Sequence, residues 1–155
     1  MKKIQTLCLV YKHPQILLGM KKRGFGTGKW NGFGGKPQGD ETVEEAIKRE
    51  LKEEAGIEAI DMEKVGLMEF YYGSNEDYLE VHIFKSYDFE GEIIESEEMK
   101  PAWFHVDDLP FDSMWPDDRH WMPLFLVGKK FKGKFIFDKD NNILEKELIE
   151  VNEII

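Results

Sequence analysis

Residues 35–57, GKPQGDETVEEAIKRELKEEAGI, contain the most clearly specified helix in the chain. Thr42 and Glu45 have the spacing of a capping box, in which each side chain accepts a hydrogen bond from the other residue's backbone N–H. Gly56 stands where a residue in the left-handed conformation would end the helix. The sequence therefore predicts a helix from Val43 to Ala55, preceded by a loop.

The glutamates of this helix do not all belong to a solvent-facing side. On a helical wheel the apolar residues fall on one stripe, formed by Ala46, Ile47 and Leu51. Glu50 and Glu54 lie within that stripe, and Glu53 lies at its edge. Ionised carboxylates turned toward a core are costly unless they are paired or coordinated, so these glutamates need a partner.

A bound cation is the simplest partner for these carboxylates. Arg49 offers only one compensating positive charge. Oxygen ligands without a companion histidine or cysteine favour Mg²⁺, with Mn²⁺ as a substitute, over zinc. Two alternatives stay open, a solvated acidic helix face and a structural cluster held by salt bridges.

The spacing of the whole stretch resembles the signature of the Nudix hydrolases. Five residues separate Gly35 from Glu41, and seven more precede Arg49-Glu50-Leu51, after which Glu53-Glu54 and Gly56-Ile57 follow at one-residue intervals. The resemblance implies an α+β fold, a Nudix-type α/β/α sandwich. In it this helix packs on a mixed, largely antiparallel sheet.

The same resemblance implies roles for individual residues. It makes Glu50, Glu53 and Glu54 metal ligands, with a backbone carbonyl from Gly34 or Gly35. Arg49 and Glu41 would pair and hold the helix and the loop in register. The substrate would be a nucleoside diphosphate linked to another group.

Hydrolysis of a phosphoanhydride needs a positioned water, neutralised phosphoryl charge and an acceptor for the water's proton. A carboxylate beside a metal can act as that acceptor. Glu54 or Glu53 is the candidate within the helix, and Glu98 in ESEEM is a further contributor to catalysis and metal binding from outside it. The sequence does not choose among the three.

Four stretches extend the likeness to the branch of this family that hydrolyses oxidised purine nucleoside triphosphates: KKRGFGTGKWNGFGGK (21–36), EKVGLMEF (63–70), ESEEMKPAWF (95–104) and MWPDDRHWMPL (114–124). This resemblance implies that Asn31 reads the purine edge and that Trp115 stacks on the base. Asp117 and Asp118 would hydrogen-bond the base. The remaining substrate-binding residues would be Phe25, Phe70, Tyr72, Leu79, Lys21 and Thr6. Tyr72 and Leu79 depart from the phenylalanine and methionine of that branch.

Adjacent acids suit base recognition, because two buried neighbours do not easily ionise together. One of Asp117 and Asp118 would keep a proton and donate while the other accepts. Exchanging that proton would admit oxidised guanine or oxidised adenine. The ordinary alternatives are a helix N-cap with an acidic first turn for the two acids, and core packing for Trp115 and Trp121.

The expected function is Mg²⁺-dependent hydrolysis of oxidised purine nucleoside triphosphates, such as 8-oxo-dGTP and 2-oxo-dATP, to the monophosphate and pyrophosphate. This reaction would cleanse the nucleotide pool. Alternative substrates are an unmodified nucleoside triphosphate, a dinucleoside polyphosphate or a nucleotide sugar. A non-catalytic nucleotide or metal sensor is the alternative from another class.

Composition sets outer limits on partners and location. The net charge of −10 argues against a nucleic-acid polymer as partner, which would need clustered Lys and Arg. The single cysteine, Cys8, lies in an apolar run, so we expect a buried thiol, no intramolecular disulfide and a cytoplasmic protein. No stretch approaches a membrane span, and the run after MKK is too short for a signal peptide. We expect a monomer with a single domain, residues 1–155.

The rest of the chain predicts hairpins and one more helix. The predicted hairpins are 3–11 with 15–22, 64–72 with 78–87 around GSNED, and KFKGKFIFD with ILEKELIEV around KDNN. A helix is predicted in DDRHWMPLFLVG despite Pro123. Residues 24–41 hold seven of the fourteen glycines and are predicted to be an irregular loop.

Overall fold

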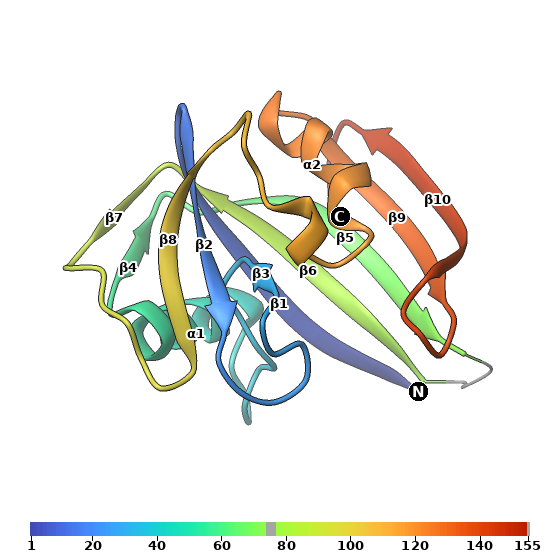
Figure 1. Ribbon diagram of the computed structural model, residues 1–155, viewed down its shortest axis with the longest axis horizontal. Helices are drawn as coiled ribbons and strands as arrows, with labels where there is room; N and C mark the ends of the chain where they lie inside the picture. The colour runs from blue at the N-terminus through green and yellow to red at the C-terminus, as the bar shows by residue number, and fades with distance from the viewer. Residues whose placement is uncertain (74–76, 155) are drawn as a thin grey trace.

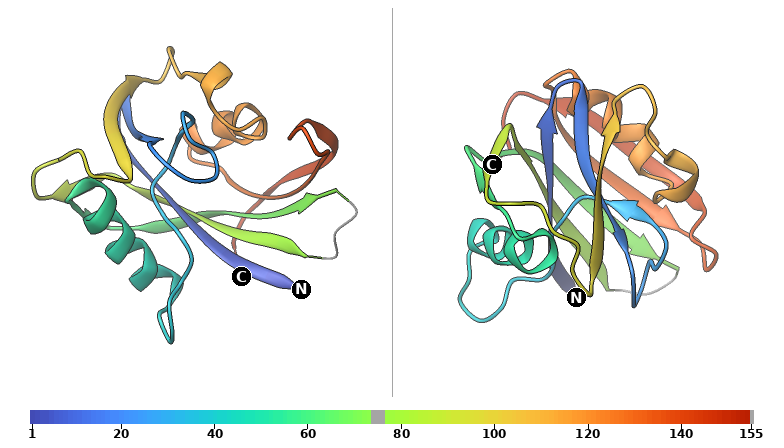
Figure 2. Two further views of the ribbon diagram at one scale, coloured as in Figure 1. Left: turned by 60° about the horizontal axis from the view of Figure 1, so that its bottom comes forward. Right: turned by 60° about the vertical axis from the view of Figure 1, so that its left-hand side comes forward.

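The computed structural model describes residues 1–73 and 77–154, which form a curved sheet with a helix on each face (Figures 1 and 2). The strands of the main sheet are β1 (Lys2–Lys12), β2 (Gln15–Lys21), β3 (Trp30–Asn31), β5 (Glu63–Tyr72), β6 (Tyr78–Ser86), β8 (Met99–His105), β9 (Lys130–Phe137) and β10 (Ile143–Val151). A two-stranded sheet pairs β4 (Glu58–Ile60) with β7 (Asp88–Glu90). The helices are α1 (Val43–Ala55) and α2 (Asp118–Leu126), with a 3-10 turn, η1, at Phe111–Ser113.

The main sheet runs in the order β10-β9-β5-β6-β1-β2-β3, and β8 pairs with β2. The pairs β1 with β6 and β5 with β9 are parallel. The other pairs in this sheet are antiparallel, and these include the three hairpins that the sequence predicts. The mixed, largely antiparallel sheet is therefore confirmed. Residues 74–76 of the predicted GSNED turn lie outside the described residues.

Side chains of the central strands point alternately to the two faces of the sheet and form two hydrophobic cores, one under each helix. On one face, Ile47 and Leu51 of α1 pack with Cys8, Leu17 and Phe84. On the other face, Trp121 and Phe125 of α2 join a second cluster that includes Leu9, Ile83, Phe131 and Phe135. Each buried side chain of this size stabilises the fold by about 1.5–3 kcal/mol relative to exposure.

The predicted ends of α1 are confirmed. The Thr42 side chain accepts from the Glu45 N–H at 3.1 Å, and the Glu45 carboxylate accepts from the Thr42 N–H at 3.0 Å. Gly56 has a φ of 75°, and its N–H donates to the Lys52 carbonyl at 3.1 Å. These contacts fix where the helix starts and stops, and hence which of its glutamates face the sheet.

The prediction of an irregular loop at 24–41 is wrong in part. Trp30 and Asn31 form β3 on the end of β2. Trp30 packs edge-on against Phe104 with ring centroids 4.8 Å apart, and Phe33 is fully buried. Packing of these two rings against the core holds the middle of the loop on the sheet and places Asn31 at the sheet edge.

Helices long and apolar enough to cross a membrane are absent from residues 1–73 and 77–154.

Candidate active site

A cavity of about 410 Å³ is bounded by the glycine-rich loop, the sheet and the start of α2. All of the predicted substrate residues line it: Thr6, Lys21, Phe25, Asn31, Phe70, Tyr72, Leu79, Trp115, Asp117 and Asp118. Gly34 and Glu54, from the predicted metal-binding set, line it too. Residues far apart in the sequence thus meet around one space.

Asp117 and Asp118 lie at the start of α2 with only 4% and 2% of their surfaces exposed. Asp117 occupies the N-cap position, but its side chain makes no capping hydrogen bond. Its Oδ2 instead accepts from Trp121 Nε1 at 2.9 Å. Oδ2 of Asp118 is buried and has no hydrogen-bond partner within residues 1–73 and 77–154. A helix N-cap therefore does not account for this pair.

The two carboxyls differ in their electrostatic surroundings. Burial raises the pKa of Asp117, and the hydrogen bond from Trp121 opposes that rise. Burial and the neighbouring Asp117 charge raise the pKa of Asp118 well above its usual range. The pKa of Asp118 is therefore raised further than that of Asp117, whose charged form the indole N–H stabilises.

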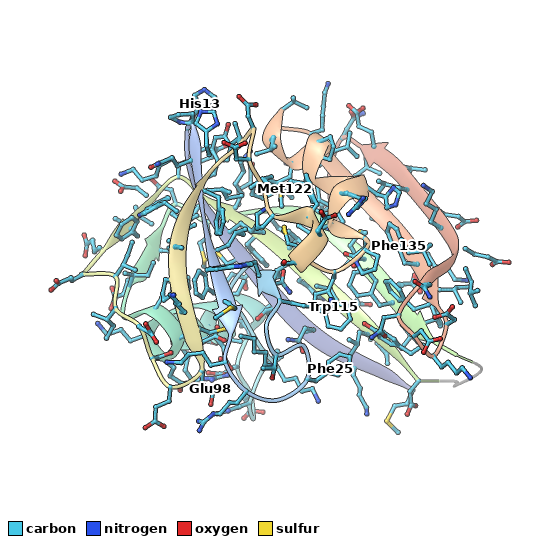
Figure 3. The ribbon with its side chains drawn as sticks, in the orientation of Figure 1. His13, Phe25, Glu98, Trp115, Met122 and Phe135 are labelled. Carbon is cyan, nitrogen blue, oxygen red and sulfur yellow. The ribbon has the colours of Figure 1, made fainter. Side chains whose placement is uncertain are left out.

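Aromatic rings form the rim and wall of the cavity. Trp115 and Phe25 lie beside each other with ring centroids 5.1 Å apart, and Phe25 is 66% exposed (Figure 3). Gly26 has a φ of 88° and lies so close to Trp115 that an added Cβ would approach the indole to 3.2 Å. Trp121, by contrast, is 1% exposed and stacks on Phe131 in the core. Core packing therefore describes Trp121 but not Trp115.

Of the three glutamates on α1 predicted to bind metal, Glu54 is the one that lines the cavity. Its Oε1 accepts from the Gly34 N–H at 3.0 Å. Burial, with a smaller contribution from the Glu50 charge, raises the pKa of Glu54 to about 8. The raised pKa shows that the charged form of this buried carboxylate lacks a compensating positive charge, which a bound cation would supply.

The predicted pairing of Arg49 with Glu41 is confirmed. Arg49 Nε and Nη2 donate to the two oxygens of Glu41 at 2.8 and 3.0 Å, and Nη2 also donates to the Lys36 carbonyl at 3.2 Å. Arg49 Nη1 donates to Glu50 Oε1 at 2.9 Å. One guanidinium thus ties α1 to the loop that carries Gly34 and Gly35.

The remaining predicted metal carboxylates are engaged in ion pairs. Glu53 is exposed and lies 3.3 Å from Arg49 Nη1. Glu98 accepts from Arg23 Nε at 3.0 Å. In the described part of the chain, no three His, Cys, Asp or Glu side chains form a ready-made metal cluster.

The backbone beside these carboxylates nevertheless fits a hard cation. A Cβ added at Gly35 would collide with Glu50 Oε1, so the bare backbone lies directly against that carboxylate. The Gly35 carbonyl oxygen already accepts hydrogen bonds from Thr6 N and Oγ1 at 2.9 and 2.8 Å, which occupy its two lone pairs. The carbonyl oxygen of Gly34 is therefore the better candidate for a metal ligand. Oxygen donors of this kind are the ligands that Mg²⁺ prefers.

Comparison with protein families gives a match to the NUDIX domain over residues 1–125. This span contains α1, with its glutamates, and the buried pair Asp117 and Asp118. The chain belongs to the NUDIX family.

Relatives of known name match nearly the full length of this chain. The zebrafish (Danio rerio) oxidized purine nucleoside triphosphate hydrolase is 48% identical over 98% of this chain and 97% of its own length. The mouse (Mus musculus) protein of the same name is also 48% identical, over 97% of this chain and 96% of its own. The crystal structure of a MutT protein from Bacillus halodurans superposes with a TM-score of 0.82 at 28% identity, covering 94% of this chain and 97% of that one.

The Nudix pocket also contains residues that the sequence did not single out. Lys29 lines it, and its Nζ lies 5.2 Å from the centre of the Trp115 ring. Gln5 and Met99 line it as well. The spacing of the Nudix signature gives no signal for these three, because they lie outside residues 35–57: Gln5 is on β1, Met99 is on β8 and Lys29 is in the glycine-rich loop before β3.

Proposed function

We propose that this protein hydrolyses oxidised purine nucleoside triphosphates, such as 8-oxo-dGTP and 2-oxo-dATP, to the monophosphate and pyrophosphate, and so cleanses the nucleotide pool. The observation that carries the proposal is the buried pair Asp117 and Asp118 in a cavity with an aromatic rim. The zebrafish and mouse relatives named for hydrolysis of oxidised purine nucleoside triphosphates support the same substrate class.

The acid pair recognises the base. Asp118 keeps a proton and donates it to an acceptor on the base, while Asp117 accepts a hydrogen bond from a donor. Moving the proton to Asp117 reverses the two roles, so that one pocket accepts oxidised guanine or oxidised adenine. Asn31, on β3 at the cavity, adds an amide that can both donate and accept.

Stacking and charge position the rest of the nucleotide. Trp115 and Phe25 cover the base at the rim. Lys21, Lys29 and Lys36 line the cavity of a chain whose net charge is −10. These lysines provide local positive charge for the triphosphate.

Mg²⁺ is the proposed cofactor, with Mn²⁺ as a substitute. Glu50, Glu53, Glu54, Glu98 and the Gly34 carbonyl are the groups that would hold it. When bound, a divalent ion neutralises charge on the phosphoryl oxygens. To bind the ion, Glu53 would give up its ion pair with Arg49, and Glu98 its ion pair with Arg23. Both are surface ion pairs, which contribute little stability. Glu54 is the proposed acceptor for the proton of the attacking water.

The chain is proposed to act as a monomer with a single domain, residues 1–155, in the cytoplasm. One main sheet contains strands from both the first and the last parts of the described chain, β1 and β10 included, which supports a single domain. Cys8 is fully buried, and burial raises the pKa of its thiol to about 12, so it is not available for a disulfide.

A substrate panel tests the proposed function. 8-oxo-dGTP, 2-oxo-dATP, dGTP, dATP, a dinucleoside polyphosphate and a nucleotide sugar are compared by kcat/KM with Mg²⁺, and the products are resolved. The proposal predicts the highest values for the two oxidised nucleotides, with pyrophosphate as a product. Preference for another substrate would replace the proposed one, and binding without turnover would indicate a sensor.

A further inference from the structure

Tyr72 lines the cavity. It is the last residue of β5, where it pairs with Phe137 of β9. Its ring stacks on Phe137 with centroids 5.2 Å apart and an interplanar angle of 17°. The strand pairing and the stacking together hold the ring in a fixed orientation, on the same cavity as Asp117 and Asp118.

The hydroxyl of Tyr72 makes no hydrogen bond within residues 1–73 and 77–154, although the residue is half-buried. Burial and the Asp117 charge raise the pKa of Tyr72 to about 12, so the phenol stays neutral whenever the acid pair titrates. A neutral phenol offers one donor and two acceptor lone pairs. Tyr72 is therefore a polar group at the cavity that has not been used by the fold.

We propose that the Tyr72 hydroxyl is a specificity-determining group, which favours purines that carry an added carbonyl oxygen over their unmodified parents. This inference rests on the proposed function, since it concerns the same base pocket.

The argument follows from what oxidation changes on the base. An oxidised purine has a carbonyl oxygen where its parent has a C–H group. A phenol that faces a carbonyl gains a hydrogen bond, whereas a phenol that faces a C–H group is buried without a partner. Sites built to hydrogen-bond a polar group reject analogues that lack the group, because their own buried polar atoms are then left unpaired.

Tyr72→Phe removes the hydroxyl and keeps the stacking ring. Tyr71→Phe is the matched control, because Tyr71 precedes it on β5, does not line the cavity and donates to Glu69 at 2.7 Å. Selectivity is the ratio of kcat/KM for 8-oxo-dGTP to that for dGTP. We expect Tyr72→Phe to lower this ratio about fivefold, mostly through a higher KM for 8-oxo-dGTP, but not to abolish the preference, because the acid pair is unchanged. Tyr71→Phe should leave the ratio within about twofold.

Calorimetric titration of 8-oxo-dGMP and dGMP in the presence of EDTA measures the same preference without catalysis. The ratio of their dissociation constants should change in Tyr72→Phe as the kinetic ratio does. A selective wild type with an equally selective Tyr72→Phe variant overturns this inference alone, as does an equal loss in both variants. A wild type that neither hydrolyses nor binds the oxidised nucleotide preferentially overturns the proposed function together with the inference.

Discussion

Trp121 donates its indole N–H to Oδ2 of Asp117 across 2.9 Å, one turn back along α2. The indole is 1% exposed and stacks on Phe131, so the donor is fixed by the core. This hydrogen bond makes the two acids unequal, because it stabilises the charged form of Asp117 while Oδ2 of Asp118 is left without a partner in the described chain.

Replacing Trp121 by Phe should therefore disturb base recognition more than packing. The ring still fills most of the core position, but the buried Asp117 loses its donor. We expect the free energy of unfolding to fall by about 1–3 kcal/mol, and the pH profile of kcat/KM for 8-oxo-dGTP to move because the pKa of Asp117 rises further. Urea unfolding and a pH series measure the two effects. An unchanged pH profile would contradict this role of the indole.

Asp118→Asn should change how stability depends on pH. The pKa of Asp118 is raised in the folded protein, so its contribution to stability is fully present below the unfolded pKa of about 3.9 and is lost as pH rises through the folded pKa. An amide has no such loss. The unfolding free energy of Asp118→Asn relative to wild type should therefore increase as pH rises above about 4. Asp40→Asn, at an exposed position, is the control. A constant difference across pH would show that Asp118 is not held protonated.

Divalent metal should stabilise the folded protein by binding the glutamates of α1. A ligand at a hundred times its dissociation constant adds about 2.7 kcal/mol when it binds only the folded state. We expect Mg²⁺ to raise the Tm of the wild type and of Glu147→Gln, an exposed control on β10, but to have little effect on Glu54→Gln. Equal Mg²⁺ responses in all three proteins would remove Glu54 from the metal site.

Arg49→Lys should destabilise the protein by about 1–2 kcal/mol. The planar guanidinium donates to both oxygens of Glu41 and to the Lys36 carbonyl, and an ammonium group cannot reproduce this geometry. Arg119→Lys is the matched control, because Arg119 is exposed and lies 3.5 Å from Asp112; its effect should stay within about 0.5 kcal/mol. Equal effects in denaturant unfolding would mean that the fork geometry of Arg49 contributes nothing.

Local rules predicted much of the fold. The capping box and Gly56 fixed the ends of α1, and alternating apolar residues located the hairpins. The strands β4 and β7 went unpredicted because three residues are too few to show a period. The strand β8 contains Pro101, which argues against a strand unless the pairing with β2 is known.

Long-range contacts explain what the sequence did not predict. Lys85 lies in β6, and a charged residue at this position gives no sign in the sequence that it is buried. It is nevertheless 2% exposed, and its Nζ donates to the Phe125 carbonyl near the end of α2 at 2.6 Å. Its Nζ also lies 4.6 Å from the centre of the Phe125 ring and 4.8 Å from that of Tyr11. In the site, the helical wheel and the signature spacing pointed to the glutamates, and the family resemblance pointed to the two acids. Only the fold shows that Glu53 and Glu98 are held by arginines.

A competition assay tests the central proposal most directly. Equal low concentrations of 8-oxo-dGTP and dGTP are mixed with the protein and Mg²⁺, and the two monophosphates are separated and quantified at early times. The ratio of products equals the ratio of the two kcat/KM values and does not depend on enzyme concentration. The proposed function predicts that 8-oxo-dGMP exceeds dGMP by at least about tenfold. Equal amounts of both, or an excess of dGMP, would contradict it.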